Sequence, residues 1–231
     1  MTVMFVTGTD TDAGKTFISS AILWGLTQSK VNTLGYKPIA AGAAIENGSL
    51  VNSDAALLAK YSAANVDAGD INPICLAPPI APHIAAQQAG ITICEEDLLT
   101  HLNQTIEKHA PEFTLVEGAG GWKVPLDLAG NTLADLPKKQ RWPVIMVVGM
   151  KLGCLNHALL TADAMISDGV ALAGWVANCV DPDMKEQSTN IESLKALLPS
   201  PCLGVVPFMA QAEPERAWSY IQSGFARYVK H

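Results

Sequence analysis

The chain has 231 residues, 49% of them hydrophobic, which suits one α/β domain with a substantial core. Its formal net charge of −7 argues against a nucleic-acid partner, and it has no apolar run of membrane-spanning length. The five cysteines are widely spread without a C-x-x-C pair, and the N-terminus does not resemble a signal peptide. We therefore expect a cytoplasmic protein with reduced thiols that acts on small molecules and binds neither nucleic acid nor membrane.

Short apolar runs alternate along the chain with segments of helical period, a pattern typical of parallel strands covered by helices. The predicted strands are Val3–Thr7, Thr33–Lys37, Phe113–Glu117, Val144–Gly149, Leu172–Ala177 and Cys202–Val206. The predicted helices are 15–28, 52–60, 95–109, 155–167, 186–197 and 214–228. Residues 38–51, with an Asn47-Gly48 turn signal, and the proline-rich stretch 71–83 are expected to be irregular. The pattern predicts one domain over 1–231, a three-layer α/β fold with a mostly parallel central sheet and helices on both faces.

The first predicted strand leads into a glycine loop, Gly8-Thr9-Asp10-Thr11-Asp12-Ala13-Gly14-Lys15-Thr16, and then a helix. Such a loop points backbone N–H groups at a triphosphate, while Lys15 reaches the phosphates and Thr16 ligates Mg²⁺. It has five residues between its glycines instead of the usual four. The nucleotide-binding residues predicted here are Asp12, Ala13, Gly14, Lys15, Thr16 and Phe17.

Three further charged residues are candidates for the same site. Lys37 and Glu117 each end a predicted strand, and the carboxyl ends of parallel strands are where ligands bind. Lys37 is either a second cation at the phosphates or a solvated lysine. Asp54, near the start of a helix, is either a third metal ligand beside Thr16 and Glu117 or a helix-capping acid.

Further motifs fall in order along nearly the whole chain. They are Gly35-Tyr36-Lys37-Pro38, Asn52-Ser53-Asp54, Pro82-His83, Val116-Glu117-Gly118-Ala119-Gly120-Gly121-Trp122, Lys151-Leu152-Gly153-Cys154-Leu155-Asn156-His157-Ala158 and Gly174-Trp175-Val176-Ala177-Asn178. With the glycine loop, this set closely resembles the dethiobiotin synthetase family, whose fold is of the P-loop NTPase type.

The resemblance implies an ATP-dependent carboxylation of 7,8-diaminopelargonate. CO₂ adds to one amine, ATP phosphorylates the carbamate, and the second amine closes the cyclic urea and expels phosphate. It implies catalytic roles for Lys15, Lys37, Thr11 and Asp12, and a Mg²⁺ ion held by Thr16, Asp54 and Glu117.

The resemblance also assigns substrate and base recognition. The substrate carboxylate is expected at a segment of the partner subunit in a homodimer, with Lys37 and Ala41 at the carbamate end. That segment comprises Lys151, Leu152, Gly153, Cys154, Leu155 and Asn156. Adenine is expected at Asn178, near Val206 and Pro207.

Three positions depart from the family pattern. Asp12 stands where the best-known members have Glu, Ala41 replaces a serine, and a shorter amide occupies the region of Asn190 instead of a tyrosine. We expect altered affinity and the same reaction. His83 and His157 are expected to be structural or to pack near the site, and Trp122 either shapes the substrate tunnel or anchors its loop.

Two alternatives remain open. A switch ATPase of the same broad fold that cycles on membranes should carry a basic amphipathic terminal helix, but the segment 214–231 offers only Arg216, Arg227 and Lys230. A related amide-forming ligase would commonly bring a glutaminase domain, for which this chain has no room.

Overall fold

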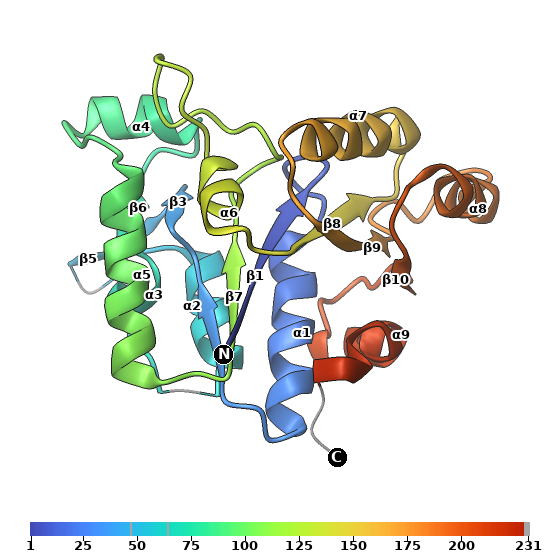
Figure 1. Cartoon of the computed structure of the whole chain (residues 1–231), viewed down its shortest axis with the longest axis horizontal. Helices are drawn as coiled ribbons and strands as arrows, with labels where there is room; N and C mark the ends of the chain where they lie inside the picture. Colours follow the sequence, from blue (N-terminus) through green and yellow to red (C-terminus); the bar gives the residue numbers. More distant parts are fainter. Residues whose placement is uncertain (47, 64, 229–231) are drawn as a thin grey trace.

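A six-stranded parallel sheet forms the centre of the protein (Figure 1). The computed structural model describes residues 1–46, 48–63 and 65–228, so Asn47 of the predicted turn and Lys230 lie outside the described residues. The strand order is β10-β9-β8-β1-β7-β2, and every pairing between neighbours is parallel. These strands are β1 (Thr2–Gly8), β2 (Thr33–Tyr36), β7 (Phe113–Glu117), β8 (Val144–Gly149), β9 (Leu172–Asn178) and β10 (Cys202–Val206). All six predicted strands are confirmed to within one residue at each end.

Helices cover both faces of this sheet, so the predicted three-layer fold is confirmed. Side chains alternate along β8: Met146 and Val148 pack in one apolar cluster with α7 and α8, whereas Ile145 and Val147 belong to the larger cluster with α1. Figure 1 shows α7 and α8 across β8 and β9 from α1 and α9. The longer helices are α1 (Lys15–Gln28), α2 (Ser53–Tyr61), α5 (Glu95–His109), α7 (Cys154–Ser167), α8 (Gln187–Leu197) and α9 (Pro214–Ile221).

The two stretches expected to be irregular contain short elements, which corrects that prediction. Residues 38–51 hold β3 (Ile39–Ala41), β4 (Ala44–Glu46) and β5 (Ser49–Val51), and β3 pairs in parallel with β6 (Ile74–Leu76). A three-residue strand is held by a partner far away in sequence, so its local pattern carries little signal.

Helical predictions need two corrections. Three short helices were not predicted: α3 (Ala68–Ile71), α4 (Pro82–Gln88) and α6 (Asp135–Gln140). The predicted helix 214–228 ends as α9 at Ile221 and continues as a 3₁₀ helix, Gln222–Tyr228. Gly224 is a weak helix former, and a Cβ there would lie 2.7 Å from the Leu203 carbonyl oxygen, so this glycine lets the chain pack onto β10.

The parallel arrangement brings the carboxyl ends of β1, β7, β8 and β9 to one edge of the sheet. The phosphate loop follows β1 at this edge, and α1 begins where that loop ends. No helix among the described residues is both long and apolar enough to cross a membrane.

Candidate active site

The phosphate loop is shaped by two residues with left-handed backbone. Gly14, with φ 86°, caps the start of α1, and Asp12 has φ 62°. A Cβ on Gly14 would lie 2.0 Å from the Asn178 side-chain nitrogen, so only glycine fits. The loop thus delivers Lys15 and Thr16 into the first turn of α1, where free backbone N–H groups favour an anion.

A buried charge cluster joins this turn to β2 and β7. The Thr16 hydroxyl donates to Glu117 Oε1 at 2.8 Å, and Lys37 Nζ donates to the same oxygen at 2.7 Å. Lys37 also donates to the Gly118 carbonyl at 3.1 Å and lies 3.3 Å from Asp54 Oδ2. The structure therefore brings together the predicted residues Thr16, Lys37, Asp54 and Glu117.

Burial and neighbouring charges set the two lysines apart. Burial first, and then the nearby Lys37 ammonium, lower the pKa of Lys15, although the carboxylates oppose this effect. Burial also disfavours the Lys37 ammonium, but Glu117 and Asp54 outweigh it, so the pKa of Lys37 is raised. Lys37 is 3% exposed and is held as a cation, which answers the alternative of a solvated lysine.

The charge cluster borders a cavity of about 750 Å³. Lys15, Thr16, Lys37 and Asp54 line it, whereas the fully buried Glu117 lies behind its wall. Thr11, Asp12, Gly14, Phe17 and Ala41 are the other predicted site residues in its lining. A volume of this order accommodates a small metabolite with phosphate groups.

The oxygen atoms in the cluster suit Mg²⁺. Glu117 Oε2 is buried without a hydrogen-bond partner among the described residues. The Thr16 hydroxyl bonds to the other oxygen of Glu117, and a partly exposed Asp54 carboxylate pairs with Lys37. Mg²⁺ takes hard oxygen ligands and keeps several waters, so two carboxylates and a hydroxyl are a fitting donor set. Asn52 caps α2 by accepting from the backbone N–H groups of Asp54 and Ala55, so Asp54 itself is not the cap.

The segment Lys151–Asn156 does not line the cavity of its own chain. It forms the turn after β8 and the first residues of α7, with Gly153 at φ 94° and Leu152 95% exposed. Lys151 Nζ pairs with Asp10 Oδ2 of the phosphate loop at 2.9 Å. The hydrogen bond from Lys151 and the positive charge of its ammonium group together lower the pKa of Asp10.

Asn178, at the end of β9, is buried and contacts the phosphate loop. Its side-chain nitrogen donates to the Ala13 carbonyl oxygen at 3.0 Å. Val206 pairs with Asn178 across β9 and β10, and Pro207 follows, so the three residues predicted near adenine lie together. None of them lines the cavity, and their role at the base stays a prediction.

The remaining predicted positions fall in different places. Asn190 lies in α8, where its amide donates to the Glu186 carbonyl. His83 has a buried Nδ1 without a partner among the described residues, and His157 is exposed near Asp10. Trp122 is 4% exposed, stands edge-on to Phe5 and is absent from the cavity lining, which favours its role as a loop anchor.

Sequence reasoning missed part of the cavity wall. Ala40 and the segment 79–82 line it, and Asn72 fixes the end of β2 by donating to the Lys37 carbonyl oxygen at 2.8 Å. The proline-rich stretch 71–83 was the one sequence signal for the segment 79–82. Nothing in the local sequence pointed to Asn72, because its partner is 35 residues away.

Comparison with solved structures defines the class of protein. The MinD cell division protein of Aquifex aeolicus superposes with a TM-score of 0.60 at 15% identity, covering 98% of this chain and 96% of that one. The signal recognition particle receptor FtsY of Elizabethkingia anophelis gives 0.53 at 11% identity over 97% of this chain and 65% of that one. With the loop and lysine described above, the fold is that of a P-loop NTPase.

Sequence comparison specifies the family. Residues 2–216 match the family model described as an AAA domain. The chain is 45% identical to the ATP-dependent dethiobiotin synthetase BioD of Pseudoalteromonas translucida, covering 98% of this chain and 99% of the relative. It is 46% identical to the enzyme of that name from Cellvibrio japonicus, over 94% of each. The chain therefore belongs to the dethiobiotin synthetase family, and the resemblance noted in its motifs is confirmed.

Proposed function

We propose that this protein makes dethiobiotin from 7,8-diaminopelargonate, CO₂ and ATP, releasing ADP and phosphate. The observation that carries the proposal is the convergence of Lys15, Lys37, Thr11 and Asp12 on one cavity, in a chain similar over nearly its whole length to enzymes of that name. In the reaction, an amine nitrogen bonds to CO₂ and loses a proton. The carbamate oxygen takes the γ-phosphoryl group, and the second amine attacks the carbonyl carbon, expelling phosphate.

The two lysines meet the electrostatic demand of this sequence. Carbamate and triphosphate are both anionic, so their approach needs positive charge held in place before they bind. Both lysines line the cavity, and Glu117 fixes Lys37. Lys15 is proposed to contact the phosphates and Lys37 the carbamate oxygen. Because both lysines are buried, their charges are weakly screened.

Mg²⁺ is proposed as the metal of this site. Thr16, Asp54 and Glu117 would hold it, and when bound it would neutralise phosphate charge. Glu117 has a second task in this chain, since it fixes both the Thr16 hydroxyl and the Lys37 ammonium through one oxygen atom.

Thr11 and Asp12 are proposed to lie beside the phosphates and the reacting amines. Both line the cavity, and the left-handed backbone at Asp12 sets the direction of its side chain. As the carboxylate is one methylene shorter than the family's Glu, Asp12 is expected to tune affinity for the diamine. Asn178, Val206 and Pro207 are proposed to serve the adenine end.

The segment Lys151–Asn156 is proposed to bind the substrate carboxylate of a neighbouring protomer in a cytoplasmic homodimer. Its backbone N–H groups open α7, and a helix N-terminus favours a carboxylate. Support for action across a dimer comes from two observations: the segment does not line its own cavity, and Leu152 is exposed.

The deciding experiment measures products with each substrate left out in turn. Purified protein with ATP, Mg²⁺, bicarbonate and diaminopelargonate is expected to release one phosphate per cyclic urea, identified by mass spectrometry. With ¹³C-bicarbonate the urea carbon should carry the label. ATP hydrolysis at an equal rate without the diamine would reject the proposed function and favour a switch ATPase.

A further inference from the structure

The loop after β7 has an inner and an outer side. Ala119, Gly120 and Gly121 line the cavity, and Val124 and Pro125 line it again further on. Between them, Trp122 and Lys123 are absent from that lining. These two residues therefore interrupt a run of cavity-lining residues and make their contacts elsewhere.

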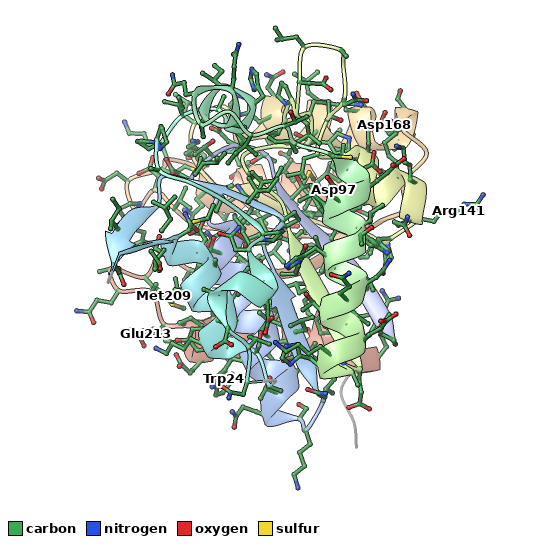
Figure 2. All side chains as sticks on the ribbon, turned by 90° about the vertical axis from the view of Figure 1, so that its left-hand side faces the viewer. Trp24, Asp97, Arg141, Asp168, Met209 and Glu213 are labelled. Atoms are coloured by element: carbon green, nitrogen blue, oxygen red, sulfur yellow. The ribbon has the colours of Figure 1, made fainter. Side chains whose placement is uncertain are left out.

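Both outer residues bind one carboxylate, that of Asp168. Trp122 Nε1 donates to Asp168 Oδ2 at 2.7 Å, and Lys123 Nζ lies 2.5 Å from the same oxygen. Asp168 is the C-cap residue that directly follows α7, and Figure 2 labels it. Its side chain is only 13% exposed, so these bonds are largely shielded from water.

A second basic residue completes the arrangement. Lys138 of α6 lies 3.5 Å from Asp168 Oδ1 and 3.0 Å from Asp135 Oδ1. Asp135 in turn accepts from the Thr132 backbone N–H at 2.7 Å. Asp168 thus contacts both the loop after β7 and helix α6.

The inner side of the loop packs against the phosphate loop. A Cβ built on Gly121 would lie 3.6 Å from the Gly8 carbonyl oxygen, and one on Gly120 would lie 3.7 Å from the Thr11 hydroxyl oxygen. Behind them, the Trp122 ring stands edge-on to Phe5 of β1 with ring centroids 6.2 Å apart. A displacement of Trp122 would therefore move the wall that faces Thr11.

We propose that Asp168 is a positioning residue for substrate binding, acting through Trp122 and Lys123 to hold the wall formed by residues 119–121. This inference rests on the proposed function for its choice of substrate. It adds a second attachment of α7 to the site, since Lys151, just before this helix, pairs with Asp10 of the phosphate loop. The helix therefore connects both loops at the edge of the cavity.

The test compares Asp168→Ala with Asp163→Ala, which removes an exposed carboxylate from the same helix. Because bonds to a largely shielded carboxylate are lost, Asp168→Ala is expected to raise the KM for diaminopelargonate roughly tenfold. The kcat should stay within about twofold, as the lysines are untouched. Asp168→Asn, which keeps an acceptor for the indole N–H, should fall in between, and Asp163→Ala should match the parent protein.

A double-mutant cycle separates positioning from general destabilisation. Trp122→Phe keeps a ring against Phe5 but lacks the N–H, so Asp168→Ala should raise the KM much less in that background. Equal effects in both backgrounds, or an unchanged KM in the single variant, would overturn the proposal.

A readout without turnover keeps this test apart from the proposed function. The emission of Trp122 is isolated by subtracting the spectrum of a Trp122→Phe protein from that of the matching protein that keeps the indole. In Asp168→Ala this difference emission is expected to shift to longer wavelength, because the ring meets water. If the parent protein forms no cyclic urea, the proposed function fails while this shift still reports the attachment. An unchanged Trp122 emission would overturn the positioning role whatever the substrate is.

Discussion

The candidate site has two halves, one around the phosphate loop and one at the start of α7, and they differ in how far contacts within the chain fix their residues. Around the phosphate loop, Lys15, Lys37 and Glu117 are buried and fixed by short contacts within the chain. At the start of α7, Leu152 and Asn156 are exposed and take no part in the cavity wall. One half is therefore ordered by contacts within the chain, whereas the proposed carboxylate-binding segment lies outside the cavity of its own chain, as the proposed homodimer requires.

The largest effect is expected at Lys37. Lys37→Met should lower kcat on the order of 10²–10³-fold, because a fixed charge at the reacting oxygens is lost. It should also lower the free energy of unfolding by about 3–5 kcal/mol, since Glu117 is left buried without its cation. Turnover and chemical denaturation measure the two effects.

A second variant separates these two consequences. Lys37→Met combined with Glu117→Gln removes the unpaired charge, so much of the stability should return. Because Glu117 is itself a proposed metal ligand, the kcat of this double variant is compared with that of Glu117→Gln alone, and it should be lower still. Activity that returned together with stability would show that Lys37 serves only the fold.

A smaller effect is expected at the other half of the site. Leu155 lies in the first turn of α7, where proline is tolerated, and Leu155→Pro deletes one backbone N–H. We expect a roughly tenfold higher KM for the diamine, because one hydrogen bond to a carboxylate is lost, with little change in the KM for ATP. Leu155→Ala keeps the N–H and should resemble the parent; an equal defect in both variants would assign the effect to the side chain.

The smallest effect, on stability, is expected at the ion pair between Asp10 and Lys151, which joins the two halves of the site. Asp10 and Lys151 are each more than a third exposed, so Asp10→Asn should cost less than about 1 kcal/mol of stability at neutral pH. The folded pKa of Asp10 lies below the unfolded value. Its contribution is therefore present above the unfolded pKa and is lost as pH falls through the folded pKa.

This contribution is measured from the free energy of unfolding of the parent protein and of Asp10→Asn, determined at a series of pH values from 7 down to the acid range. The difference between Asp10→Asn and the parent should shrink as the carboxylate is protonated. A difference that grew toward acid pH would contradict the sign of the assigned pKa shift.

The sequence predicted what depends on long or repeated patterns. Six apolar runs indicated the six sheet strands, and parallel order then placed Lys37 and Glu117 at one edge. The strands β3 and β6 escaped prediction because each has three residues and depends on the other, 35 positions away. For the same reason Asn72 was missed.

The side on which a loop residue lies is equally hidden from a local pattern. Trp122 follows four residues with a small side chain or none, so the local sequence is compatible with a role in shaping the substrate tunnel and with a role as a loop anchor. Its contacts with Phe5 and Asp168, which favour the anchor, come from distant parts of the chain. The family resemblance, and not the local pattern, supplied both the roles expected of the segment Lys151–Asn156 and its expected place in a partner subunit. The structure adds that this segment does not line the cavity of its own chain.

The proposed complete site joins the phosphate-loop half of one chain to the α7 half of another. It is tested by coexpressing Lys37→Met and Leu155→Pro chains with different tags and purifying in series the dimers that carry both. If the halves act across the dimer, one site in each mixed dimer is intact, so at low diamine concentration the activity should be about half that of the parent. Activity no higher than the mean of the two single variants, or failure to recover doubly tagged protein, would contradict the account.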